Sequence, residues 1–323
     1  MQFELGEKPM KPQTVTGTWT GRGLSITAGN AGKTIHFTVP VQLPAEGTGL
    51  YPAVILTQNS STIPLPANVA TIQLPVDAIA SQAMPGTGIF YDLYGKSASA
   101  GTMMAWAWAV SRVVDVLEQT PQAQINVSRL GVTGCSRYGK GALVSGAFDD
   151  RIALVIPQES GAGGDSCWRT AQALRNAGSN VETAQDQATT GWMGKAFNAY
   201  ASPSAIGRLP VDHHELAALV APRGLYSTGN GQYEWLGKTS ALDCMSAANK
   251  VFTALGVPDN QGFNQDAGHT HCYAFPASQK AQLDSFIQKF LFNSLGVTAG
   301  AGITSVSGRP DPKWAPWAAP TLA

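Results

Sequence analysis

The first fifty residues alternate between apolar and polar positions, with many threonines and glycines among them. The alternation is clearest over residues 14–20 and 35–41. A period of two is typical of strands that bury one face, so we expect antiparallel strands at the start of the chain. The run Ala53-Val54-Ile55-Leu56 has no polar position and predicts a fully buried strand.

Helical spacing and strand-like runs then follow one another. Apolar side chains over residues 102–117 keep helical spacing, and Pro121 lies just beyond. A strand over 130–134, a helix over 138–147 and a strand over 152–156 form a unit that implies parallel strands. The other expected elements are a strand over 71–74, a looser polar stretch over 161–210, helices over 214–220, 242–255 and 278–292, and a strand over 224–228.

This alternation predicts an α/β fold. We expect a three-layer αβα sandwich with a mostly parallel central sheet and antiparallel N-terminal strands. No linker interrupts the pattern, so residues 1–323 are expected to form a single domain. The C-terminal residues, from about 296 to 323, carry Trp314 and Trp317 among prolines and are expected to pack on this domain as an irregular strap.

The number and distribution of charged residues argue against two classes of binding partner. Charged residues make up 13% of the chain, about half of the roughly 25% of an average soluble protein. The 21 basic and 21 acidic residues form no run of either sign, which argues against nucleic acid and membrane partners. The N-terminus, Met1-Gln2-Phe3-Glu4, does not resemble a signal peptide, so we expect any such peptide to have been removed already.

The cysteines indicate the compartment. There are four, without a CxxC spacing, so two disulfides in a secreted, extracellular protein are expected and metal binding is not. The sequons Asn59-Ser60-Ser61 and Asn126-Val127-Ser128 fit secretion. Four reduced thiols in a cytosolic enzyme are the alternative.

A nucleophile elbow is predicted where the strand over 130–134 meets the following helix. Ser136 lies there in Gly134-Cys135-Ser136-Arg137-Tyr138-Gly139, one residue longer than the G-x-S-x-G of α/β-hydrolases. A sharp turn of this kind presents the hydroxyl at the carboxyl end of the sheet, and the backbone N–H of Arg137 would face a developing oxyanion. A serine that merely caps the helix is the alternative.

A serine nucleophile needs a base, which in this fold lies before the last helix. Only His269 and His271 of the five histidines occupy that place. His271 adjoins Cys272 just as Ser136 adjoins Cys135, so a Cys135–Cys272 disulfide would hold the two loops together. We therefore favour His271 as the base.

Four sequence motifs closely resemble the glucuronoyl esterases of carbohydrate esterase family 15, in their fungal form. They are GCSRYGKGA over 134–142, PQESGAGG over 157–164, CWR over 167–169 and GHTHC over 268–272. The resemblance covers nearly the whole chain and implies an α/β-hydrolase with a Ser-His-Glu triad.

The resemblance implies that Glu159 is the acid of this triad. From the residues alone, Glu234 and Asp243, which follow the strand over 224–228, are positional rivals, and Glu234 remains open as a second acid. A loop carboxylate that caps backbone amides is the alternative interpretation of Glu159. The resemblance also implies a second disulfide between Cys167 and Cys244, and an oxyanion role for the Arg137 side chain.

Substrate contacts are implied in the same way for Lys140, Glu182 and Trp235. Surface charge, for Lys140 and Arg137, and core packing, for Trp235, are the alternatives. The chain departs from the family at two positions, because Glu182 stands where a glutamine is usual and Thr190 where a glutamate is usual. An ionised carboxylate accepts hydrogen bonds but cannot donate them, so contacts with the sugar are expected to differ.

The implied function is hydrolysis of the ester between 4-O-methyl-D-glucuronoyl groups of glucuronoxylan and lignin alcohols. We expect an acyl-enzyme path without cofactor or metal, and a monomer. Two alternatives stay open: an acetyl xylan or feruloyl-type esterase, and a non-catalytic carbohydrate-binding protein with a hydrolase fold.

Overall fold

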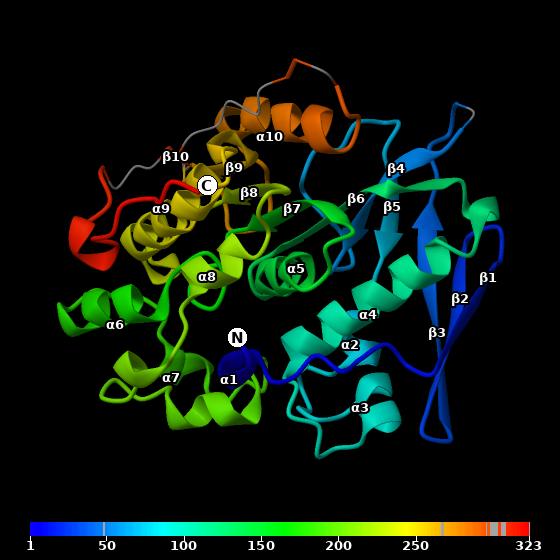
Figure 1. The fold of residues 1–323 in the computed structure, drawn as a ribbon, viewed down its shortest axis with the longest axis horizontal. Coiled ribbons are helices and arrows are strands. Elements are labelled where there is room, and N and C mark those ends of the chain that lie inside the picture. Colours follow the sequence, from blue (N-terminus) through cyan, green and yellow to red (C-terminus); the bar gives the residue numbers. More distant parts are fainter. Residues whose placement is uncertain (48, 266–267, 295, 298–302, 305–307, 323) are drawn as a thin grey trace.

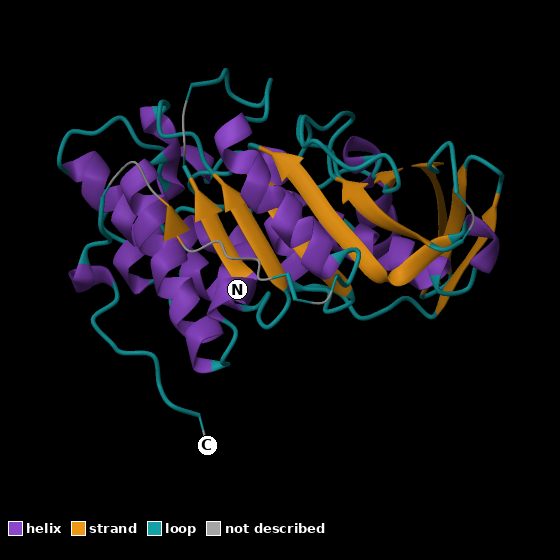
Figure 2. Ribbon diagram, turned by 90° about the horizontal axis from the view of Figure 1, so that it is seen from above, coloured by secondary structure: helices purple, strands orange, loops and turns teal. Residues whose placement is uncertain are grey.

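A twisted sheet crosses the whole molecule in the computed structural model (Figures 1 and 2). The structure describes residues 1–323 except 48, 266–267, 295, 298–302, 305–307 and 323. The described strands are β1 (Thr14–Trp19), β2 (Gly23–Asn30), β3 (Lys33–Gln42), β4 (Tyr51–Leu56), β5 (Ala70–Gln73), β6 (Ile125–Cys135), β7 (Ile152–Gln158), β8 (Gly224–Thr228), β9 (Gln261–Asn264) and β10 (Ile303–Thr304).

The strand order is β1-β2-β3-β5-β4-β6-β7-β8-β9-β10. Neighbouring strands in this order are antiparallel from β1 as far as β5. The remaining neighbours, from the pair β5–β4 to the pair β9–β10, are parallel. The mostly parallel sheet with antiparallel N-terminal strands is thereby confirmed.

Helices surround this sheet. They are α1 (Gln2–Leu5), α2 (Val76–Ile79), α3 (Ile89–Tyr94), α4 (Thr102–Leu117), α5 (Arg137–Ala147), α6 (Trp168–Asn176), α7 (Ala184–Gln187), α8 (His213–Ala218), α9 (Lys238–Ala254) and α10 (Ala277–Phe290). Two separate apolar clusters show that the sheet is covered on both faces.

Strand β4 demonstrates how the layers form. Ala53 and Ile55 belong to the larger cluster, which includes the apolar residues of α4 and α5, whereas Val54 and Leu56 belong to the smaller cluster under α10. Successive side chains of a strand point to opposite faces, so a strand between two layers has no polar position. The fully buried strand predicted over 53–56 is confirmed, as is the long helix over 102–117.

Three features were not predicted. The stretch over 161–210 contains α6, whose buried residues include Thr170 and Gln172 and which therefore lacks a clear apolar stripe. The four residues of β9 are all buried, but three of them are Gln261, Gly262 and Asn264, which do not form an apolar run. The short helices α1 to α3 also went unpredicted.

The expected strap over 296–323 lies partly outside the described residues. Ile303 and Thr304 form β10, which pairs with β9, so this part of the tail is not irregular. Further along, the Lys250 ammonium donates to the carbonyl of Ala315 at 2.5 Å, which fastens the tail to α9. That residues 1–323 form a single domain stays a prediction.

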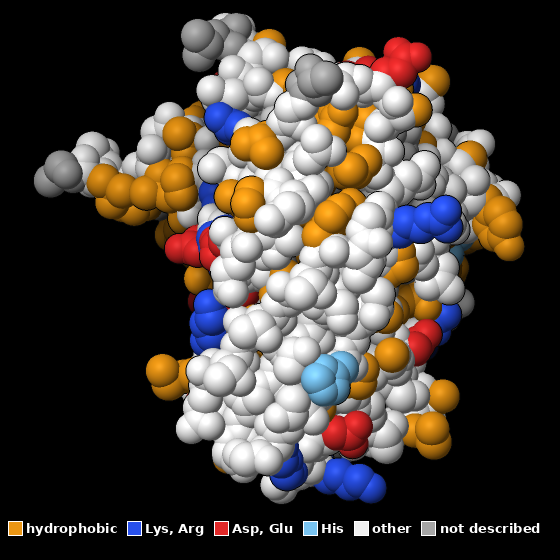
Figure 3. Space-filling model, turned by 90° about the vertical axis from the view of Figure 1, so that its right-hand side faces the viewer, with side chains coloured by type: hydrophobic (Ala, Val, Ile, Leu, Met, Phe, Trp, Pro, Cys, Tyr) orange, Lys and Arg blue, Asp and Glu red, His pale blue; other side chains and the backbone are white. Residues whose placement is uncertain are grey.

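Uncharged side chains dominate the face seen in Figure 3, where the basic and acidic groups lie scattered. Among the described residues, none of the helices combines the length and apolar character needed to cross a bilayer.

Candidate active site

The loop between β6 and α5 places Ser136 in a strained turn. Its φ and ψ are 58° and −128°, a combination that non-glycine residues rarely adopt and that nucleophile elbows require. Its N–H donates to the carbonyl of Gln158 at 2.9 Å, which ties the turn to β7. Ser136 is the N-cap residue of α5, but its side chain makes no capping hydrogen bond, so the alternative of a simple capping serine has no support.

The two glycines of the elbow are required by close packing. A Cβ on Gly134 would lie 2.2 Å from Thr57 Oγ1, and a Cβ on Gly139 would lie 2.7 Å from the carbonyl oxygen of Gln158. Both distances are shorter than a van der Waals contact, so neither position accepts a side chain without a shift of its neighbours. The longer spacing, G-x-S-x-x-G, therefore still forms a tight strand-to-helix turn.

Ser136 opens onto a pocket of about 560 Å³ that His271 also lines. The backbone N–H of Arg137 is the first of α5, and such groups have no partner within the helix. The Arg137 side chain is exposed, with its guanidinium carbon 5.6 Å from the centre of the Tyr138 ring. The lining residues are Gln58, Asn59, Ser60, Thr62, Cys135, Ser136, Arg137, Tyr138, His271, Cys272 and Tyr273.

His271 lies between this pocket and Glu159. Its Nδ1 is 2.6 Å from Glu159 Oε2, and an ionised carboxylate can only accept, so Nδ1 carries the proton and Nε2 is free to act as a base. Nε2 is 3.5 Å from the sulfur of Cys272, which is bonded to the residue before Ser136. No hydrogen bond joins the Ser136 hydroxyl to His271 in the described part of the chain, and such contacts often tighten only when substrate binds.

Glu159 is 1% exposed and directly follows β7, with a φ of 46°. Its Oε1 is 2.9 Å from Nε2 of His269. Burial alone would raise the pKa of Glu159, but the hydrogen bonds from His271 and His269 outweigh burial and hold that pKa below its ordinary value. Glu159 also accepts from the N–H of Cys272 at 3.4 Å, but its shorter contacts are to the two imidazoles, unlike those of a carboxylate that merely caps amides.

Both expected disulfides are present. Cys135–Cys272 joins the nucleophile loop to the histidine loop, with a Cα–Cα distance of 5.8 Å. Cys167–Cys244 joins the start of α6 to α9, at 5.3 Å.

The three residues with implied sugar contacts lie close to one another, and Trp235 lies beside His271. The Trp235 ring is 4.7 Å from the His271 ring, edge to face, and its carbonyl accepts from the N–H of Glu182 at 3.1 Å. Nζ of Lys140 is 3.8 Å from Glu182 Oε2. Trp235 is only half-buried, so it is not a core residue.

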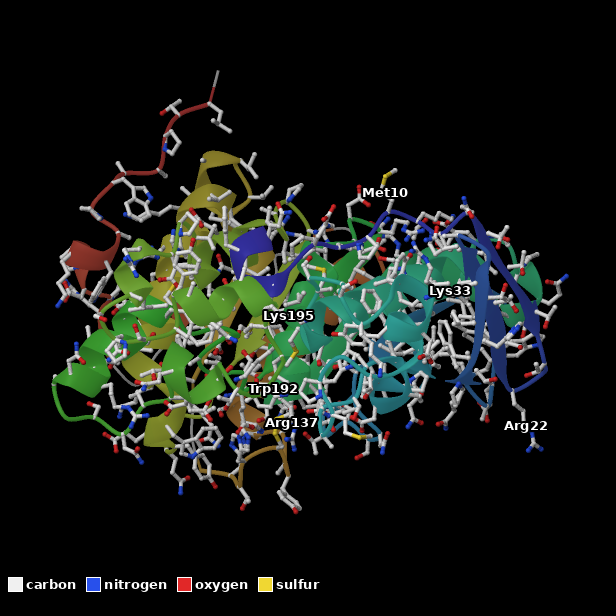
Figure 4. The ribbon with its side chains drawn as sticks, turned by 90° about the horizontal axis from the view of Figure 1, so that it is seen from below. Met10, Arg22, Lys33, Arg137, Trp192 and Lys195 are labelled. Carbon is white, nitrogen blue, oxygen red and sulfur yellow. A yellow bond between two sulfur atoms is a disulfide. The ribbon has the colours of Figure 1, made fainter. Side chains whose placement is uncertain are left out.

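Lys140 is buried rather than on the helix surface. Its ammonium donates to the carbonyl of Ser160 at 2.6 Å and lies 5.8 Å from the centre of the Trp192 ring. Burial lowers its pKa, while the nearby carboxylates of Glu182 and Asp165 act in the opposite direction. In the view of Figure 4, Trp192 and Arg137 project close to each other.

Glu182 and Thr190, the two departures from the family pattern, both contact Gln187, at its side chain and at its backbone respectively. Glu182 Oε2 accepts from Nε2 of Gln187 at 3.2 Å. The Thr190 hydroxyl donates to the carbonyl of Gln187 at 2.8 Å and so closes its own turn.

The positional rivals for the acid are not brought to His271. Glu234 is exposed and lines a different pocket. Asp243 accepts from the N–H of Asp311 at 2.8 Å.

Asn230 instead occupies the place after β8, and the sequence analysis missed it. Its Nδ2 donates to the carbonyl of His269 at 3.0 Å and to Glu159 Oε2 at 3.4 Å. Its position just after the carboxyl end of a parallel strand was the available signal. Trp192 was missed for another reason, since it reaches Lys140 from a polar loop that has no recognisable pattern.

One group of possible metal ligands occurs among the described residues: Cys135, His271 and Cys272. Both sulfurs belong to the disulfide, and a thiolate, not a disulfide sulfur, is the metal ligand. The group therefore belongs to the site just described.

Known proteins resemble the chain over its full length. A sequence profile described as "Glucuronyl esterase, fungi" matches residues 26–256. A 4-O-methyl-glucuronoyl methylesterase of Hypocrea jecorina is 47% identical over 327 residues, which cover 100% of this chain and 69% of that protein. One of Podospora anserina is 46% identical, over 99% of this chain and 68% of that protein.

Solved structures agree. The glucuronoyl esterase catalytic domain from Hypocrea jecorina has a TM-score of 0.94 at 46% identity, covering 100% of this chain and 88% of that one. A serine-to-alanine mutant of the Sporotrichum thermophile glucuronoyl esterase, in complex with methyl 4-O-methyl-β-D-glucopyranuronate, has a TM-score of 0.93 at 42% identity, covering 100% and 87%. The chain belongs to the fungal glucuronoyl esterase family, and its fold is that of an α/β-hydrolase.

Proposed function

We propose that this carboxylic ester hydrolase cleaves the ester between a 4-O-methyl-D-glucuronoyl group of glucuronoxylan and a lignin alcohol. Family membership supports the reaction class. The observation that carries the proposal is the arrangement of His271, whose Nδ1 binds Glu159 at 2.6 Å while its other face lines the pocket of Ser136.

The chemistry follows from this arrangement. Ser136 Oγ attacks the ester carbonyl carbon as His271 Nε2 takes its proton, and Glu159 stabilises the imidazolium. The tetrahedral oxyanion accepts hydrogen bonds from the Arg137 N–H and guanidinium. Collapse of the intermediate expels the alcohol, which receives the proton from His271. A water molecule, activated by the same histidine, then releases the glucuronate from Ser136.

The acyl group is placed on the side of Lys140, Glu182 and Trp235. The Lys140 ammonium and the Trp235 indole N–H can donate to sugar oxygens, and Glu182 can accept from hydroxyls. The Sporotrichum thermophile relative was solved in complex with methyl 4-O-methyl-β-D-glucopyranuronate, which supports a uronate as the acyl group.

We place the alcohol in the 560 Å³ pocket that Ser136 and His271 line. None of the three sugar contacts lines that pocket, whereas the rings of Tyr138 and Tyr273 do. Tyr273 is 82% exposed, so its ring is free to pack against an aromatic alcohol.

The compartment and the oligomeric state belong to the same proposal. The two disulfides support a secreted, extracellular protein. A monomer is expected, and size-exclusion chromatography with light scattering would test it.

The test of the function compares substrates. Benzyl and methyl esters of 4-O-methyl-glucuronate, acetylated xylan and methyl ferulate are offered to the same preparation. We expect turnover of the glucuronate esters, with a higher kcat/KM for the benzyl ester. Turnover of acetylated xylan or methyl ferulate alone would favour one of the other esterases, and no turnover of any ester would favour the non-catalytic alternative.

A further inference from the structure

Two histidines, not one, bind the carboxylate of Glu159. His271 Nδ1 lies 2.6 Å from Oε2, and His269 Nε2 lies 2.9 Å from Oε1. The mechanism above uses only the first of these contacts. The second histidine lies two residues earlier in the same loop, and its side chain is 5% exposed.

We propose that His269 is a positioning residue, which holds Glu159 Oε1 so that Oε2 keeps its hydrogen bond with His271. This inference rests on the proposed function of Glu159 and His271. The last torsion angle of a glutamate side chain is soft, so a carboxylate held through one oxygen alone can rotate.

The other contacts of Glu159 are longer than those to the histidines. Gln158 Nε2 and the N–H of Cys272 lie 3.3 and 3.4 Å from Oε1, and Asn230 Nδ2 lies 3.4 Å from Oε2. Hydrogen bonds to a carboxylate are strongest near 2.7–2.9 Å, so the bond from His269 is the main restraint on Oε1.

His269 is itself held for this task. Asn230 Nδ2 donates to its carbonyl at 3.0 Å and fixes the loop at that point. Because Glu159 is ionised, Nε2 of His269 must be the protonated nitrogen. Nδ1 of His269 is buried and has no hydrogen-bond partner among the described residues.

A neutral His269 serves the reaction better than a charged one. A cation at this position would neutralise Glu159 before the imidazolium of His271 forms. With the proton on Nε2 alone, His269 orients the carboxylate, and the negative charge remains available to His271 when the latter accepts the proton of Ser136.

The test uses three substitutions of His269 that differ in whether a donor reaches Glu159. His269→Leu removes the donor, His269→Asn carries an amide on a shorter side chain, and His269→Gln carries one that can reach. His36→Gln, at an exposed position of strand β3, is the matched control. The measurements are kcat and KM for benzyl glucuronate, the thermal midpoint, and the rate at which a fluorophosphonate labels Ser136.

We expect the Leu and Asn variants to lose kcat by about 10- to 100-fold, the range for residues that orient a reactive group, with KM changed less than about twofold. The Gln variant should recover at least about tenfold relative to Asn, at a similar thermal midpoint. Labelling of Ser136 should follow kcat.

Equal rates for the Gln and Asn variants, or a Leu variant within about twofold of the parent chain, would overturn the proposal. Labelling separates this outcome from failure of the proposed function. A parent chain that does not turn over glucuronate esters, yet labels faster than the Leu variant, would refute the substrate and leave the role of His269 intact.

Discussion

Glu159 and Glu182 are both carboxylates of the candidate site, but their surroundings give them different roles. Glu159 is almost fully buried and receives hydrogen bonds from two imidazoles. The Glu182 side chain is 36% exposed and faces the ammonium of Lys140 at 3.8 Å. A buried carboxylate that accepts hydrogen bonds from imidazole N–H groups suits a triad acid, whereas an exposed carboxylate beside a lysine suits contact with a substrate.

Replacing Glu159 by glutamine tests the first role. The amide keeps the shape but cannot stabilise the imidazolium, so Glu159→Gln should lower kcat by about 10³- to 10⁴-fold with little change in KM. Glu234→Gln, at the exposed rival position, should stay near the parent activity. A loss at Glu234 equal to that at Glu159 would contradict the assignment of the acid.

The Glu182→Gln variant tests the second role. Loss of the carboxylate removes the ionic partner of Lys140 and leaves its ammonium free to bind a sugar oxygen. One additional hydrogen bond is worth about 0.5–1.5 kcal/mol, so KM for benzyl glucuronate should fall by about 2- to 10-fold while kcat changes little. The glutamine carbonyl oxygen still accepts from sugar hydroxyls, so a higher KM in steady-state assays would mean that the negative charge of Glu182 is itself needed to bind the substrate.

Neighbouring residues in the sequence identified some members of the candidate site but not others. Ser136 and His271 have neighbours in the chain that mark them, the elbow glycines and Cys272. Asn230 and Trp192 have no such neighbours, because they reach the site only through the arrangement of β8 and the loop before Met193. Glu159 was indicated by the family resemblance alone.

At the scale of elements, the glycines of helix α5 allow it to pack closely against the sheet. A Cβ on Gly146 would lie 2.1 Å from a methyl carbon of Val155 in β7, and one on Gly141 would lie 2.7 Å from the Trp106 ring in α4. The helix can therefore approach both β7 and α4 closely. This approach fixes the position of its first turn and of Ser136, which precedes that turn and lines the pocket.

The two disulfides connect different elements, so their removal should have different effects. Replacing both cysteines of a pair by serine should cost about 2–5 kcal/mol of unfolding free energy in either case. Only the Cys135/Cys272 pair also joins the loops of Ser136 and His271, so kcat should fall strongly for this variant and less for the Cys167/Cys244 variant. Urea unfolding and kcat on benzyl glucuronate would measure both effects, and equal kcat values in the two variants would contradict the account.

Elements with regular apolar spacing were predictable, and elements stabilised by polar contacts were not. The strand over 224–228 has the predicted bounds, and the last helix runs over 277–290 where 278–292 was expected. In contrast, α6 begins at Trp168, whose N–H donates to the carboxylate of Asp212, forty-four residues later. A contact between residues so far apart in the chain produces no periodic pattern in the sequence.

On the scale of the whole molecule, charged residues fasten the N-terminal segment to the layer of helices. Lys8 Nζ donates to Ser111 Oγ in α4 at 2.8 Å and to the carbonyl of Phe148 after α5 at 2.5 Å. Arg151 binds Asp149 at 2.7 Å and Asp115 at 2.8 Å. One network thereby connects the segment before β1 with α4 and with the start of β7.

The pH dependence of stability should report this network. Burial alone would raise the pKa of Asp149, but the hydrogen bonds from Arg151 outweigh burial and lower it to about 2. Since this pKa lies below that of the unfolded chain, the ionised carboxylate stabilises the fold above about pH 4, and that stabilisation is lost as the pH falls through about 2. Asp149→Asn should therefore cost about 2 kcal/mol at neutral pH.

Urea unfolding at pH 7 and at pH 2.5 checks this expectation. The difference in unfolding free energy between the parent chain and Asp149→Asn should be markedly smaller at the lower pH. A difference that stays the same at both values would mean that Asp149 contributes through packing and not through charge.

The layers and the mostly parallel sheet followed from the alternation of elements, because parallel strands joined by helices allow few arrangements. The pairing of β10 with β9 could not be predicted in this way, because it places the tail beside a strand whose own residues are mostly polar. We predict that residues 1–323 unfold as one domain.

The central claim is that Ser136 is the nucleophile of a glucuronoyl esterase. The direct measurement is kcat on benzyl glucuronate for the parent chain, for Ser136→Ala and for Ser202→Ala, an exposed serine that does not line the pocket. We expect a loss of about 10⁴- to 10⁶-fold for Ser136→Ala alone, with Ser202→Ala close to the parent chain. More than about a hundredth of the parent activity in Ser136→Ala would contradict this claim.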